Sequence, residues 1–93
     1  MKHLILDGSK IHSIADFHSA MNELLDFGPY YGNNSDALWD MMSGGIGLNV
    51  FLHWTHSQYA EQSLGGHYQI ILSIFNDVKA LTYQGSSFNY SLE

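Results

Sequence analysis

The sequence predicts an α/β fold in which a three-stranded parallel sheet packs with four helices. Three strand-like segments are separated by two pairs of helical segments, in the order β-α-α-β-α-α-β. Strands that are separated by helices favour parallel pairing, because a parallel connection needs a long crossover. The length of 93 residues suits one domain, so we expect residues 1–93 to form a single unit with its own core.

The first half of the chain contains one predicted strand and two predicted helices. Residues 3–6 form a short apolar run that ends at the turn Asp7-Gly8. The motif Ser13-x-x-Asp16 resembles a capping box, and apolar residues recur at helical spacing over about 14–26. A second helix is predicted over about 35–43. Its N-cap is Asn34 or Ser35.

The second half repeats this order and adds a final strand. Residues 48–54 contain consecutive apolar side chains, which are typical of a strand covered on both faces. Thr55-x-x-Gln58 predicts a capping box for a short third helix that ends at Gly65-Gly66. A fourth helix is expected over about 67–81. Apolar and polar residues then alternate over 87–92, which indicates a half-covered strand.

The charge distribution disfavours nucleic acid as a partner. Three basic and nine acidic residues give a net charge of −6, and residues 11–78 contain no Lys or Arg. Phosphate binding needs clustered cations, whereas this anionic segment would attract a basic protein. Solubility is the simpler explanation of the same charge.

The chain shows no sign of secretion or membrane insertion. It contains no cysteine, so disulfides and thiolate metal sites are excluded. The first apolar run is too short for a signal peptide before Asp7 interrupts it. No segment approaches the roughly 18 apolar residues of a membrane span. We therefore expect a cytoplasmic protein with no membrane partner.

The helix predicted over 35–43 carries two aspartates on one face. At about 100° per residue, Asp40 lies about 40° from Asp36, with Trp39 beside them and the apolar residues opposite. Like charges at this spacing cost a helix a few tenths of a kcal/mol. The helix dipole can account for Asp36 in the first turn, but not for Asp40 near the C-terminal end. Asp40 is therefore a candidate binding residue.

The motif Tyr30-Tyr31-Gly32-x-Asn34-x-Asp36-Ala37-Leu38-Trp39-Asp40 resembles the barstar-like family of intracellular ribonuclease inhibitors. The similarity extends over most of the chain, through Asp7-Gly8, Ile11-x-Ser13-Ile14-x-Asp16, Trp54 and Phe75-x-x-x-Lys79-Ala80. It implies the family fold, a three-stranded parallel sheet with four helices. It also implies an immunity protein of a toxin–antitoxin pair, whose second helix and preceding loop plug the active site of a small basic secreted ribonuclease or nuclease toxin.

The resemblance also implies which residues touch the partner. Asp40 matches the family aspartate that occupies a phosphate site, and Asp36 matches a second interface aspartate. Tyr30 and Trp39 match aromatic contacts. The remaining two assignments are Asn34, which matches the motif and caps the helix, and Asp77, which replaces a family glutamate and is one methylene shorter.

Three positions depart from the family pattern. Gly45 and Gly47 stand where a tryptophan and a glutamate are usual, and Asn33 replaces another glutamate. The rim has thus lost charge and an aromatic contact, which leaves open whether the partner is barnase or another nuclease. The glycine-rich segment 43–47 is expected to be mobile, because glycine loses most entropy on ordering.

Three other functions are compatible with parts of the sequence: an enzyme, a metal-binding protein and an interaction domain of the same fold. Two close carboxylates can perform acid–base chemistry, but the chain has no nucleophile motif and no phosphate-binding loop, so we expect no enzyme and no cofactor. His53-x-x-His56 has suggestive metal-ligand spacing, yet no HExxH motif or cysteine accompanies it, so we expect no metal. The alternative to ribonuclease inhibition is an interaction domain of the same fold that binds a different toxin or a non-nuclease basic partner.

Overall fold

The computed structural model describes residues 1–44, 48–81 and 87–93, and within them the predicted fold class is confirmed. Three strands form one parallel sheet in the order β1-β2-β3, with bounds β1 Lys2–Asp7, β2 Asn49–Thr55 and β3 Ser87–Leu92. In the central register, Val50 pairs with Lys2 on one side and with Phe88 on the other.

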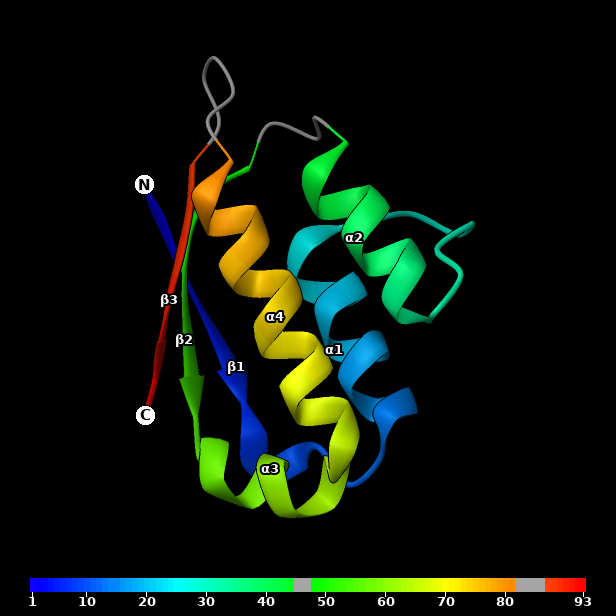
Figure 1. Cartoon of the computed structure of the whole chain (residues 1–93), viewed down its shortest axis with the longest axis vertical. Coiled ribbons are helices and arrows are strands. Elements are labelled where there is room, and N and C mark those ends of the chain that lie inside the picture. Colours follow the sequence, from blue (N-terminus) through cyan, green and yellow to red (C-terminus); the bar gives the residue numbers. More distant parts are fainter. Residues whose placement is uncertain (45–47, 82–86) are drawn as a thin grey trace.

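The helices all lie on one side of the sheet (Figure 1). Their bounds are α1 Ile14–Leu25, α2 Ser35–Ser43, α3 Ser57–Leu64 and α4 Gly66–Ala80, with a short 3-10 helix, η1, at Gly8–Lys10. Helices α1 and α4 cover the sheet, and α2 packs on α4. Helix α3 contacts η1 and α4 beyond the carboxyl end of β2. Helix α2 is therefore held away from the sheet, with one side free.

Three aromatic side chains fill the space between the sheet and the helices. Trp54 from β2, Phe17 from α1 and Phe75 from α4 are fully buried. Their ring centres are 5.6 Å apart for Phe17 and Trp54 and 5.9 Å apart for Trp54 and Phe75. Such packed aromatic groups contribute beyond their buried area, so this cluster fixes α1 and α4 on the sheet.

The expectation that the central strand is covered on both faces is wrong. Along β2, Val50, Leu52 and Trp54 are buried, whereas Phe51 and His53 between them are only half-buried. Both crossovers run over the same face, so none of the described helices covers the other face. Phe51 lies on this open face. Its apolar side chain between Val50 and Leu52 made the segment resemble a strand that is covered on both faces.

The predicted capping box of the third helix is also wrong. Helix α3 begins one residue later than that motif requires, after His56, which is in the left-handed region with φ 50° and caps no backbone group through its side chain. Thr55 is the last residue of β2, and its hydroxyl donates to the carbonyl oxygen of Leu6 at 3.4 Å. The Thr55 hydroxyl is thus hydrogen-bonded to β1 and does not cap the helix.

The chain reverses tightly after β1 because Gly8 has no side chain. A Cβ atom at this position would lie 2.4 Å from the carbonyl oxygen of His56 and 2.5 Å from that of Thr55. Asp7 completes the turn by accepting a hydrogen bond from the backbone N–H of Ser9 at 3.0 Å. Among the described residues, none of the helices is long and apolar enough to cross a membrane.

Candidate functional site

The start of α2 is fixed by one asparagine, which settles the choice between the two predicted caps. Asn34 Oδ1 accepts a hydrogen bond from the backbone N–H of Ala37 at 2.8 Å, and Asn34 Nδ2 donates to the carbonyl oxygen of Gly32 at 3.2 Å. N-cap bonds of this kind stabilise a helix by about 1 kcal/mol. The same side chain therefore joins the preceding loop to the helix.

A buried hydrogen bond anchors the loop to α1. The Tyr31 hydroxyl lies 2.6 Å from Nδ1 of His18, and the two residues are only 7% and 2% exposed. The Tyr31 ring also packs on Phe27, with ring centres 4.8 Å apart. Sequence reasoning missed this pair, although His18 lies on the apolar stripe of α1, four residues after Ile14.

Burial changes the titration of both partners in this pair. It raises the pKa of Tyr31 to about 12. It also lowers the pKa of His18, and the charge of His67 lowers it further. A neutral imidazole beside a protonated hydroxyl can form the hydrogen bond without burying a charge.

The two consecutive tyrosines of the loop point in opposite directions. Tyr30 is 97% exposed, whereas Tyr31 is buried as described above. The anchored neighbour leaves the Tyr30 backbone little freedom, so a large aromatic surface is presented to solvent next to α2. Aromatic residues in such positions are enriched in protein interfaces.

Helix α2 presents its carboxylates to solvent and buries its other side. Asp36 and Asp40 are exposed, and neither makes an ion pair within the described ranges. Leu38 and Met42 are buried in the core, and Trp39 is half-buried against it. The structure thus exposes Asp36 and Asp40 and buries the opposite side of the helix, as the helical periodicity predicted.

Asp77 is the remaining site residue predicted from the sequence. It is exposed on α4, one residue before the buried Val78. Helix α4 packs against α2, so Asp77 belongs to the element that supports the acidic helix. Its contact with a partner stays a prediction. The departures at Gly45 and Gly47, and the expected mobility of that segment, lie outside the described residues.

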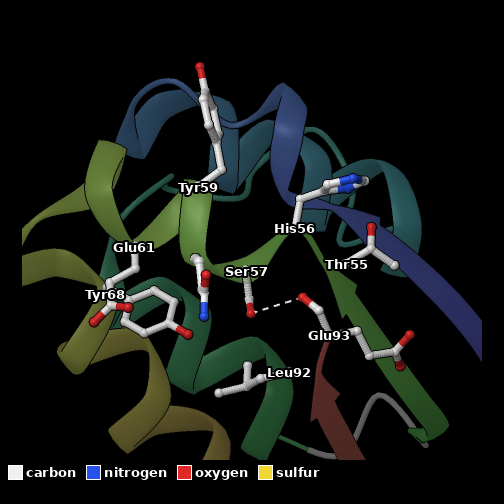
Figure 2. Close-up of a pocket in the computed structure, with 9 residues that line it drawn as sticks. Thr55, His56, Ser57, Tyr59, Glu61, Tyr68, Leu92 and Glu93 are labelled. Carbon is white, nitrogen blue, oxygen red and sulfur yellow. Dashed lines mark hydrogen bonds between the residues drawn. The ribbon is translucent and has the colours of Figure 1, made fainter.

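A depression of about 860 Å³ lies at the other end of the molecule, where α3 meets the carboxyl ends of β2 and β3 (Figure 2). The hydroxyl of Ser57 points at the backbone of Glu93 and donates to its carbonyl oxygen at 3.1 Å. That hydroxyl is therefore paired with the backbone instead of with a general base. The predicted site residues do not line this depression.

A comparison with protein families decides the relationship. The family model described as Barstar (barnase inhibitor) matches residues 1–93. The chain belongs to the barstar family. This barstar-family chain is also similar to a protein of Bacillus subtilis (strain 168) named putative ribonuclease inhibitor YrdF. The two are 30% identical over 79 residues, which cover 85% of this chain and 87% of that protein.

Proposed function

We propose that this barstar-family protein inhibits a small basic secreted ribonuclease or nuclease toxin and acts in the cytoplasm as an immunity protein, without enzymatic activity. The observation that carries the proposal is the pair of exposed carboxylates on α2, which lack ion-pair partners within the described part of the chain. Family membership and the name of the relative support the same role.

In the proposed complex, α2 and its preceding loop enter the nuclease active site. Active sites that bind RNA phosphates hold Arg, Lys or His side chains, and a carboxylate can replace the phosphate between them. Asp40 is assigned this position, with Asp36 as a second acidic contact. Tyr30 and Trp39 supply aromatic contact area around them.

The loop anchors support tight binding because they limit the ordering that binding would require. Asn34 and Tyr31 tie both ends of segment 31–34 to helices. A preorganised surface loses less conformational entropy on association, which increases the affinity for a given contact area.

The decisive test is Asp40→Ala, with Glu61→Ala as a matched control. Both residues are exposed helical acids, but Glu61 lies on α3. Truncating a carboxylate that is buried among nuclease cations leaves those cations unpaired and costs about 2–5 kcal/mol of binding. The barnase–barstar complex of this same family contributed to that range, so the figure is a family value. We expect the control to bind like the wild type.

The measurement is inhibition of a small basic ribonuclease, followed by titration calorimetry of this chain with the same ribonuclease. An Asp40→Ala protein that inhibits as strongly as the wild type would refute the phosphate-mimic role. If the wild type binds a basic protein that is not a nuclease, and inhibits no ribonuclease, the interaction-domain alternative holds instead.

A further inference from the structure

The open face of the sheet carries a row of polar and aromatic side chains that the inhibitory role does not use. His3 on β1 and His53 on β2 face each other across the strands, with Nδ1 of His3 2.8 Å from Nε2 of His53. On the other side of His53, its Nδ1 lies 2.6 Å from Oε2 of Glu93. The ring of Phe51 flanks both imidazoles, with ring centres 5.4 Å and 4.7 Å away.

The two imidazoles meet through their nitrogens and not through their faces. Their ring centres are 5.1 Å apart and their planes differ by 27°. The facing nitrogens are 2.8 Å apart, and adding the radius of each ring to this distance nearly gives the 5.1 Å between the ring centres. The facing nitrogen atoms therefore lie close to the line that joins the ring centres, and both point at the same position between the rings.

Glu93 fixes the proton of His53. The Glu93 carboxylate also accepts a hydrogen bond from the Ser91 hydroxyl. A carboxylate accepts hydrogen bonds, so the contact with Glu93 places an N–H on Nδ1 of His53 and turns Nε2 toward His3. A carboxylate that holds the distal N–H of an imidazole is the usual support of a metal-ligating histidine.

We propose that His3 and His53 form a binding site for a divalent cation of the zinc class, in which the cation replaces the proton shared by the two rings. His3 then carries its own proton on Nε2, toward solvent. Tetrahedral Zn–N bonds of about 2.0–2.1 Å need the two nitrogens to separate to about 3.3 Å, a small movement for exposed side chains. Imidazole is a preferred ligand of Zn²⁺, and water completes the coordination.

The site differs from the one that the sequence spacing suggested. His56 lies away from the pair, with its Nδ1 3.3 Å from Oδ1 of Asp7. The sequence spacing suggested only His56 as a partner of His53, because the strand register that brings His3 beside His53 is not visible in a local pattern. Within residues 1–44, 48–81 and 87–93, no cluster of three or more potential metal ligands occurs, so the proposed site has two protein ligands.

The test is a Zn²⁺ titration of the purified full chain by calorimetry, with His3→Ala, His53→Ala and the control His56→Ala. We expect one Zn²⁺ per chain and a higher melting temperature with Zn²⁺. Each ligand variant should lose at least about 10-fold in affinity, and Glu93→Gln about 10-fold or more, as for other residues that orient a ligand. The His56→Ala control should bind like the wild type.

Several results would overturn the site. These are a wild type that does not bind Zn²⁺, a His53→Ala protein that binds equally well, or a requirement for His56. Binding that needs His3 but not His53 would point to backbone nitrogens around His3 and also exclude the pair. Thermal melting without Zn²⁺ checks that each variant folds. If His53→Ala does not fold, His3→Ala carries the test, because His3 is exposed. Nuclease inhibition should be unchanged in both ligand variants, because the site lies on the uncovered face of the sheet.

Discussion

The hydrogen bond between Tyr31 and His18 makes a sharp prediction about stability. Replacing Tyr31 by Phe removes one hydroxyl and leaves the ring that packs on Phe27. Nδ1 of His18 then remains buried without its partner at 2.6 Å. A buried polar group that loses its partner costs about 1–3 kcal/mol. We therefore expect the free energy of unfolding to fall by that amount.

The neighbouring residue provides the control. Tyr30 has the same side chain but is 97% exposed, so Tyr30→Phe should change the free energy of unfolding by less than about 0.5 kcal/mol. The assay is urea unfolding at pH 7.5, followed by circular dichroism. In thermal melts, each kcal/mol lost corresponds to about 4–8 °C in a domain of this size.

Equal stability of Tyr31→Phe and Tyr30→Phe would refute the anchoring role. The comparison requires that both variants have the same denaturant slope. A changed slope would show that a substitution alters the compactness of the chain. An anchored loop also predicts that Tyr31→Phe weakens nuclease binding more than its loss of stability explains, because the loop must then be ordered on association.

Three further predictions concern pH, salt and Asp77. Burial lowers the pKa of His18 in the folded state, so the unfolded chain binds more protons below about pH 6.5. The contribution of neutral His18 to the free energy of unfolding is therefore present above about pH 6.5 and is lost as the pH falls through the folded-state pKa. Urea unfolding from pH 7.5 to 5 should show that fall, and a His18→Gln variant should show less of it. If the charge of −6 steers a basic nuclease, stopped-flow association should slow steeply with added salt while dissociation changes less, and equal association rates would assign the charge to solubility. Asp77→Ala should weaken nuclease binding by under about 1 kcal/mol, mainly through a slower association rate. A large coupling energy with Asp40→Ala in a double-mutant cycle would contradict the place of Asp77 at the rim of the interface.

Local patterns were enough to predict α2 and its acidic face. The bounds 35–43, a cap at Asn34 or Ser35 and the exposure of Asp36 and Asp40 follow from periodicity and capping chemistry within ten residues, and the structure selects Asn34. These features depend only on neighbours in the chain, and the structure confirms them.

Features that depend on distant neighbours were not predictable in the same way. The partner of His18 is 13 positions away, and that of His3 is 50 positions away. The failed capping box at Thr55 has the same origin, because the register with Leu6 and Asp7 decides how far β2 extends. Strand register and loop packing follow from the whole chain, which no short pattern contains.

The parallel register also bears on how quickly the protein can be made. Val50 pairs with Lys2 and with Phe88, so the sheet joins positions that are 48 and 38 residues apart. Closing such long loops costs entropy before any contact compensates for it, and folding is correspondingly slow for chains rich in distant contacts. For the proposed immunity role, this means that a reserve of folded inhibitor is needed before the nuclease appears, because newly synthesised chains would fold too late.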